Sequence, residues 1–380
     1  MRCTRRPANE LPKHLCDIQA SLARNISAVS DHRNIRDIGG DAFAHLLGRV
    51  LHDRCRSKLA CSVRNRFGLM VALPKPQSTT VGAIYAAYEA QAKSWDSWGI
   101  SVGEAGTECD RALWYGFRWA SAHEVHSGRQ LRLFETGNIE EDRLVADLER
   151  IGVEVYGQQD KIRLVSGFVR GKCDGKAMNV PEASKTEHLL EFKSSNAKGF
   201  ALIVKDGCQK AKPLHYAQCQ LGMHAFGLTR CLYLVSCKDS DSLYSERIEY
   251  DLEFCLRLVA RCERIVFSDM PPSRLSENPE FFGCMFCKHK AVCHHEAQPR
   301  VNCRTCLHAQ PESGGDCHIS CARWAKPLSI DEQRDGCPAH LYLPGLVNGE
   351  QIDVDEDAET ITYRMKSGEV WVDGEGRKAA

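Results

Sequence analysis

The sequence predicts an α/β or α+β protein whose core is a mixed β-sheet flanked by helices, followed by a metal-binding appendage at the C-terminal end. Segments with apolar residues at helical spacing and segments with alternating apolar residues follow one another as helix, strand, strand, strand, helix and strand, an order that indicates a mixed sheet. Composition indicates the appendage, because residues 281–340 hold eight of the 20 cysteines.

The helices and strands of this core are placed by their patterns. Helical spacing predicts helices over 80–96 and 139–151, and a turn-rich stretch between them is expected to enter another helix near Asp110. Alternation around glycines predicts strands over 152–180 and then a short strand over 188–195, "HLLEFKSS". A helix over 213–228, a buried strand over 231–237, an edge strand over 245–251 and a long helix over 251–268 complete the predicted core.

Composition argues against several classes of protein. The 50 basic and 50 acidic side chains cancel, so no global field indicates a polyanionic partner. No stretch approaches the ~18 apolar residues that a membrane helix needs, so no membrane partner is expected. The sequence opens without a signal peptide, and we therefore expect a cytoplasmic protein whose cysteines bind metal rather than form disulfides.

Charge and cysteine content divide the chain into four regions. Residues 1–69 carry 13 basic and 6 acidic residues with weak apolar patterning, which favours a poorly ordered basic extension; the alternative is a basic arm that contacts DNA. Residues 70–297 hold the predicted core, and residues 298–345 form a small cysteine-rich module. Residues 346–380 are an acidic tail with a predicted β-hairpin.

Three carboxylates and a lysine give the strongest chemical signal. Asp174 ends a strand before a glycine turn, and Glu191 and Lys193 alternate in the next strand, so both are expected on one face. Glu141, on the helix upstream, is preferred to Glu140 as the third carboxylate. Such oxygen ligands suit Mg²⁺ or Mn²⁺, which activates water for phosphodiester hydrolysis, and the lysine orients that water or helps to deprotonate it.

The helix over 213–228 is expected to cover the same cleft. Tyr216 and Gln220 are four residues apart and share one face of a helix, whereas Gln218 points elsewhere. Tyr216 and Gln220 are therefore the candidates for positioning the substrate.

Together these residues resemble the PD-(D/E)xK nuclease superfamily, particularly its RecB-like branch. The helix glutamate, "CDG", "EFK" and "HYAQCQLGMHAFG" follow in that superfamily's order and approximate spacing, and the last segment is also similar to a helix of lambda-type phage exonucleases. His224 stands where the family's Q-x-x-x-Y motif, counted from Gln220, has tyrosine. The resemblance spans about residues 80–295. It implies a restriction-endonuclease-like fold and a metal-dependent DNA exonuclease in recombination, repair or phage DNA processing.

A first set of cysteines has the spacing of a metal site. Cys284, Cys287 and Cys293 form C-x2-C-x5-C and need a fourth thiol, for which Cys109 is the best candidate. CRISPR-associated exonucleases and AddB-type helicase–nucleases of the RecB-like branch have this arrangement. The resemblance implies a 4Fe–4S cluster on these four cysteines, joining the two ends of the nuclease domain, with zinc as the rival metal.

A second set of cysteines follows in the appendage. Cys303 and Cys306 are spaced C-x2-C, and together with Cys321 and Cys337 they are the best four ligands for a small zinc site. Cys317 or His340 could substitute. The segment over 321–340 is similar to an appendage of phage-encoded nucleases, and a structural role is favoured over contact with DNA or a partner protein.

Substrate binding requires a local basic surface, because the net charge is zero. Four lysines flank the strand that carries Glu191 and are the candidates for phosphate contact: Lys198, Lys205, Lys210 and Lys212. DNA is thus the expected partner, together with an unidentified recombination or phage protein. An iron–sulfur oxidoreductase and a catalytically silent DNA-binding accessory protein are the alternative functions.

Overall fold

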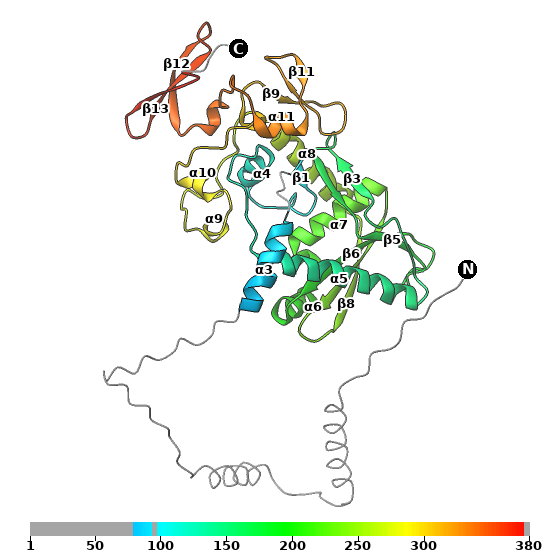
Figure 1. The fold of residues 1–380 in the computed structure, drawn as a ribbon. Coiled ribbons are helices and arrows are strands. Elements are labelled where there is room, and N and C mark those ends of the chain that lie inside the picture. The colour runs from blue at the N-terminus through cyan, green and yellow to red at the C-terminus, as the bar shows by residue number, and fades with distance from the viewer. Residues whose placement is uncertain (1–78, 93–96, 376–380) are drawn as a thin grey trace, which may run out of the picture. The chain divides into compact units, whose positions relative to one another are not determined.

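A five-stranded mixed sheet forms the centre of the computed structural model, which describes residues 79–92 and 97–375 (Figure 1). Its strands, in spatial order, are β2 (Glu154–Tyr156), β5 (Gly175–Met178), β6 (His188–Ser195), β7 (Arg230–Cys237) and β8 (Leu243–Glu249). Within this sheet, only β6 and β7 pair in parallel. A parallel pair needs a long crossover, and here it contains helices α6 (Ala197–Ala211) and α7 (Pro213–Phe226).

One face of this sheet is covered by the long helix α5 (Gly128–Arg150), which runs across it in Figure 1. Leu144 and Leu148 of α5 form one apolar cluster with Leu190 and Phe192 of β6. The helix begins at a capping box, in which the Ser127 and Gln130 side chains bond each other's backbone amides. The even-numbered positions of β6 are therefore the ones that face α5.

The opposite face of the sheet packs on α6 and α7, and α8 (Leu252–Phe267) packs in turn on α7. Leu189 of β6 and Tyr233 of β7 belong to this second apolar cluster, together with Ala217 and Met223 of α7. Seven cysteines that lack ligand spacing are all buried, as small apolar residues would be: Cys173, Cys208, Cys219, Cys231, Cys237, Cys255 and Cys262.

A smaller sheet and two helices complete this part of the chain. Strands β1 (Ile100–Ser101), β4 (Val169–Lys172) and β3 (Lys161–Leu164) pair in that order. Helix α3 (Thr79–Gln91) packs on α5, and a Glu89 carboxylate oxygen accepts a hydrogen bond from the Gly128 amide. Helix α4 (Asp110–Phe117) is mostly buried, and Cys109 caps its N-terminus.

The C-terminal part consists of short elements. Two short helices, α9 (Phe282–Met285) and α10 (Lys290–His294), precede the 3₁₀ turn η2 (Cys303–Thr305). The small sheet β9 (Ala309–Pro311), β10 (Ile319–Cys321) and β11 (Lys326–Pro327) is followed by α11 (Ile330–Asp335) and a further turn, η3 (Pro344–Leu346). The chain then forms the antiparallel sheet β12 (Gly349–Asp355), β13 (Thr360–Met365) and β14 (Val370–Asp373).

The structure confirms the predicted mixed sheet flanked by helices and differs from the predicted elements in three places. Helix α5 begins at Gly128 rather than near 139. The sequence pattern missed its first turns because they are solvent-exposed and lack an apolar stripe. Helix α6 was not predicted; Gly207, with φ of 73°, interrupts its pattern with a kink. The predicted hairpin has a third strand, β12.

The predicted basic extension over 1–69 lies outside the described residues. Among the helices that the structure describes, none is long and apolar enough to cross a membrane.

Candidate active site

Strands β5 and β6 bring Asp174 next to Glu191 and Lys193. The two strands pair antiparallel with Gly175 opposite Leu190, so Asp174 lies alongside β6. An Asp174 carboxylate oxygen accepts a hydrogen bond of 2.6 Å from the Phe192 amide. The Lys193 ammonium forms a hydrogen-bonded ion pair with the Glu191 carboxylate, which confirms that these two side chains share a face of the strand.

Helix α5 contributes Glu141 to the same group. Its carboxylate accepts a hydrogen bond of 2.9 Å from the Gln159 side-chain amide. Burial raises the pKa of Glu141, and the charge of Asp174 raises it further, so these carboxylates lie within electrostatic reach of each other. Glu140 instead forms an ion pair of 3.6 Å with Arg143 on its own helix. Glu141 is thus the one of the two that interacts with Asp174, and its role as a metal ligand stays a prediction.

The four groups crowd negative charge into a partly buried space. Glu191 is only 2% exposed. Burial raises its pKa to about 7, and Asp174 and Glu141 add to this rise while Lys193 opposes it. Burial also raises the pKa of Asp174, against the effect of Lys193 and the Phe192 amide. Three carboxylates near one ammonium are a donor set that suits a divalent cation, because such an ion offsets the excess negative charge.

Lys193 remains protonated in this environment. Burial by itself would lower the pKa of the Lys193 ammonium, but the carboxylates of Glu191 and Asp174 outweigh it and the pKa is raised. The side chain is a quarter exposed, so the ammonium reaches the edge of the site. A protonated lysine can donate hydrogen bonds to water or to a phosphate oxygen, but it cannot accept a proton.

The structure gives Gln220 and Tyr216 interactions away from this group. Both ends of the buried Gln220 amide bond backbone, since its nitrogen donates to the Glu249 carbonyl and its oxygen accepts from the Asp251 amide. Tyr216 packs edge-on against Phe254 with ring centroids 5.2 Å apart. These contacts join α7 to the start of α8, and the role of both residues in positioning substrate stays a prediction that the contacts do not support.

His215 is a neighbour of the site that sequence reasoning missed. Its Nδ1 lies 2.7 Å from the Tyr233 hydroxyl on β7. Burial lowers the pKa of His215 to about 4, and the nearby charges of Lys193 and Lys212 lower it further, so the ring is neutral at pH 7. The only sequence signal for His215 is its position in the first turn of α7, which follows the strand that carries Lys193. This signal becomes informative only when the path of the chain from β6 to β7 is known.

The four candidate DNA-binding lysines follow β6 on α6 and at its end. Lys198, Lys205 and Lys210 are exposed, and Lys210 forms an ion pair of 3.3 Å with Asp206. Lys212 is half-buried and acts electrostatically on His215. Contact of these four lysines with phosphate stays a prediction.

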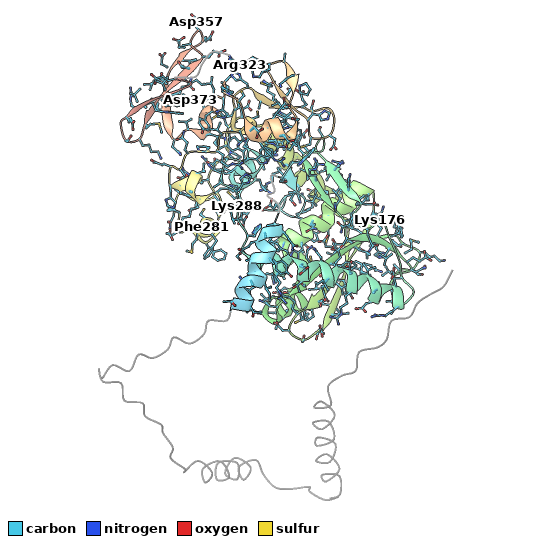
Figure 2. The ribbon with its side chains drawn as sticks, viewed as in Figure 1. Lys176, Phe281, Lys288, Arg323, Asp357 and Asp373 are labelled. Atoms are coloured by element: carbon cyan, nitrogen blue, oxygen red, sulfur yellow. The ribbon has the colours of Figure 1, made fainter. Side chains whose placement is uncertain are left out.

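The first cysteine set converges on one cavity. Cys109, Cys284, Cys287 and Cys293 line it together with Tyr115. The pKa of Cys287 is raised by burial and then by the charges of the other three cysteines, so all four thiols are near neighbours. Figure 2 shows Phe281 and Lys288 on the segment that carries three of them. The aromatic residues of α4 pack inward; Trp114 donates a hydrogen bond of 2.8 Å to the Ser268 carbonyl.

The second cysteine set lines a separate cavity in the C-terminal module, formed by Cys303, Cys306, Cys321 and Cys337. At neither cavity, nor among the carboxylates, are the side chains drawn together into a ligand shell. Within residues 79–92 and 97–375, no group of three or more His, Cys, Asp or Glu side chains is arranged to hold a metal ion as it stands. Metal binding at these three places therefore stays a prediction from the type of the side chains and their convergence.

Comparisons with known proteins find no matching family model and no matching curated protein. Among solved structures, the chain is similar to the alkaline exonuclease LHK-Exo from Laribacter hongkongensis, at 16% identity over 48% of this chain and 90% of that one, with a TM-score of 0.32. The same values hold for LHK-Exo in complex with dAMP. The structure of SSO0001 matches at 15% identity over 58% of this chain and 98% of that one, with a TM-score of 0.34. Such low values leave the activity of this chain to be argued from its own residues.

Proposed function

We propose that this protein is a divalent-metal-dependent DNA nuclease. The observation that supports this function is the convergence of Glu141, Asp174 and Glu191 with Lys193 at the crossing of α5, β5 and β6. A carboxylate triad beside a protonated lysine suits hydrolysis of a phosphodiester, in which negative charge accumulates on a phosphate that is already anionic.

Each side chain has a distinct role in this proposal. Glu141, Asp174 and Glu191 would hold Mg²⁺ or Mn²⁺, which supplies an activated water and offsets charge on the scissile phosphate. Lys193 stays protonated, so it donates hydrogen bonds to the attacking water or the phosphate rather than removing a proton. Lys212 and the exposed lysines of α6 bind the flanking phosphates.

The finer expectation is an exonuclease that acts on DNA ends in recombination, repair or phage DNA processing. The same proposal includes a 4Fe–4S cluster on Cys109, Cys284, Cys287 and Cys293, because four thiols line one cavity and four thiolates are the ligand set of that cluster. The cluster would be structural, since phosphodiester hydrolysis transfers no electrons. An oxidoreductase, in contrast, would need the cluster and not the carboxylates.

The decisive test is cleavage of end-labelled linear DNA by Asp174→Asn in Mn²⁺ or Mg²⁺. Asparagine keeps an oxygen that can accept the Phe192 amide hydrogen bond but loses the ligand charge, so we expect a rate about 10²–10³-fold below wild type with an unchanged melting temperature. Glu140→Gln is the control and should cleave normally. Wild-type protein that shows no metal-dependent cleavage, or full activity in Asp174→Asn, would contradict the proposal. The labelled fragments also separate exonuclease from endonuclease action.

A further inference from the structure

We propose that one structural Zn²⁺ is bound by Cys303, Cys306, Cys321 and Cys337. This metal site would also hold the buried side chain of Arg304 in place between the C-terminal module and the core that carries the carboxylates. The four cysteines come from η2, the residue after it, the end of β10 and the loop after α11. This proposal does not depend on the nuclease activity.

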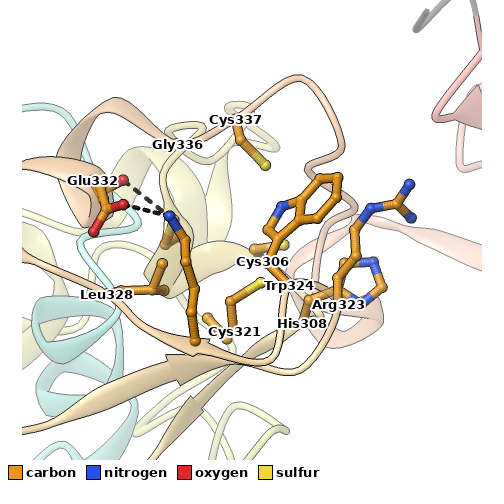
Figure 3. Close-up of a pocket in the computed structure, with 12 residues that line it drawn as sticks. Cys306, His308, Cys321, Arg323, Trp324, Leu328, Glu332, Gly336 and Cys337 are labelled. Carbon is orange, nitrogen blue, oxygen red and sulfur yellow. Dashed lines mark hydrogen bonds and ion pairs between the residues drawn. The ribbon is translucent and has the colours of Figure 1, made fainter. Parts of the chain in front are cut away.

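The cavity that these cysteines line has a volume of about 150 Å³. Figure 3 shows the side chains of Cys306, Cys321 and Cys337 turned toward the space at its centre, with Trp324 beside them. Four thiolates around one centre are the ligand set of structural zinc, which is tetrahedral.

The two rival ligands of the module are engaged elsewhere. The Cys317 thiol donates to the Trp98 carbonyl at 2.6 Å, outside the cavity that the other four cysteines line. His340 packs edge-on against Tyr342, with ring centroids 4.6 Å apart, and its Nε2 lies 3.1 Å from the Thr305 hydroxyl. The structure therefore selects four thiols from the six side chains that spacing allows.

The module has little regular structure of its own, and its buried apolar residues, such as Ile319 and Leu343, pack into the main core cluster of the chain. Strands β9, β10 and β11 are only three, three and two residues long, and α11 has six residues. An element set of this size usually depends on a metal or disulfides. A site that links η2, β10 and the end of α11 would cross-link these short elements to one another, in addition to their packing on the main core.

Arg304 lies between the first two proposed ligands and points away from the cavity into the core. It is 1% exposed, and its guanidinium carbon lies 4.0 Å from the centroid of a Trp119 ring. Its nitrogens donate to the Phe117 carbonyl at 3.1 Å and the Trp98 carbonyl at 2.9 Å. A buried guanidinium is costly unless its donors are satisfied, so its position must be held accurately.

The metal site is suited to holding it. Cys303 and Cys306 flank the turn that carries Arg304, and Gln333 of α11 accepts a hydrogen bond of 2.9 Å from its Nε. Because Cys337 follows α11, one ion bound by these cysteines would fix both the arginine and its glutamine partner. Loss of the ion is thus expected to release the module from α4.

The first experiment measures the zinc and iron content of the full-length protein by mass spectrometry, with wild type, Cys321→Ser, Cys337→Ser and the matched control Cys317→Ser. We expect about one zinc per chain in wild type and Cys317→Ser and close to none in the two ligand variants. Cys109→Ser should lose iron and keep zinc, which separates this site from the proposed cluster. Wild type without zinc, zinc retained in both ligand variants, or iron at this site would overturn the proposal.

The second experiment keeps the proposal testable if the ligand variants do not fold. Titrating folded wild-type protein with a mercurial that blocks thiols should release the zinc in step with modification of four cysteines. The role of Arg304 is tested with Arg304→Lys. This variant should retain zinc, since Arg304 is not a ligand, but it should melt several degrees lower than wild type and be cleaved faster by protease within residues 298–345. The control variant Arg323→Lys, near the same cavity, should keep the melting temperature and the protease resistance of wild type. An Arg304→Lys variant that is as stable as wild type would overturn the proposal that Arg304 joins the module to the core.

Discussion

At the residue scale, the site depends on the alternation of one strand. Leu190 and Phe192 of β6 face α5, so Glu191 and Lys193 between and after them face the other side of the sheet. A shift of one residue in the pairing of β5 with β6 would separate Asp174 from both of them. The packing of Leu190 and Phe192 therefore fixes the chemistry of their neighbours.

We predict that two adjacent glutamates of α5 differ sharply in function. Glu141→Gln removes a carboxylate that interacts with Asp174, so Mn²⁺ affinity and DNA cleavage should fall by about 10–100-fold. Glu140→Gln breaks only an ion pair with Arg143 on the same helix and should leave both unchanged. Calorimetric titration with Mn²⁺ and a cleavage assay measure the two effects. Equal losses in the two variants would refute the assignment of Glu141.

Metal binding is expected to weaken as the pH falls through 7. The pKa of Glu191 in the folded protein is raised to about 7, so this carboxylate is protonated below that pH and ionised above it. A bound cation requires the ionised form, and protons therefore compete with the metal. The Mn²⁺ dissociation constant should be about tenfold larger at pH 6 than at pH 8. A dissociation constant that does not change over this range would show that Glu191 is not a ligand.

At the scale of elements, two parts of α7 have different neighbours. His215, at its start, lies near Lys193, and Gln220, further along, fastens the helix to the turn between β8 and α8. Tyr216 and Gln220 lie on one face of α7, as predicted. This face packs against α8 rather than opening toward the carboxylates, because α8 returns along α7 after the edge strand.

Gln220→Ala should therefore affect stability more than metal binding. The substitution leaves the Glu249 carbonyl and the Asp251 amide without their partner, which costs about 1–3 kcal/mol in the free energy of unfolding. Gln218→Ala, at a half-buried position of the same helix, is the control and should cost less, since water reaches that position. Urea unfolding measures the stabilities, and titration with Mn²⁺ should give wild-type affinity for both. A folded Gln220→Ala that loses metal affinity would restore the residue to the site.

At the scale of the whole described chain, cysteines distant in sequence come together at one cavity. Cys109 caps α4, while its three partners belong to the segment around α9 and α10. All the carboxylates lie between these positions in the sequence. A cluster at this cavity would close a loop that contains the entire candidate site, so its loss should loosen the fold before it changes the chemistry.

We predict that protein purified without oxygen is brown and contains iron and sulfide, and that Cys109→Ser is colourless. The variant should melt at lower temperature and be cleaved by protease near residues 280–295, since that segment loses its attachment to α4. Cys262→Ser, at a buried cysteine of α8 outside the cavity, is the control and should keep the colour. Iron and sulfide analysis with limited proteolysis gives the answer. A colourless wild type that holds only zinc would replace the cluster with a zinc site.

The sequence by itself determined the order of most central elements and the shared face of Glu191 and Lys193, and it indicated two sets of cysteines with the spacing of metal ligands. These follow from local rules, namely the two-residue repeat of a strand, the 3.6-residue repeat of a helix and the spacing of metal ligands. Tertiary structure alone decided that Gln220 bonds backbone, that His215 lies beside the lysine, and that Cys317 is engaged by Trp98. Those outcomes depend on which distant segment packs against each residue, and local pattern carries no record of that partner.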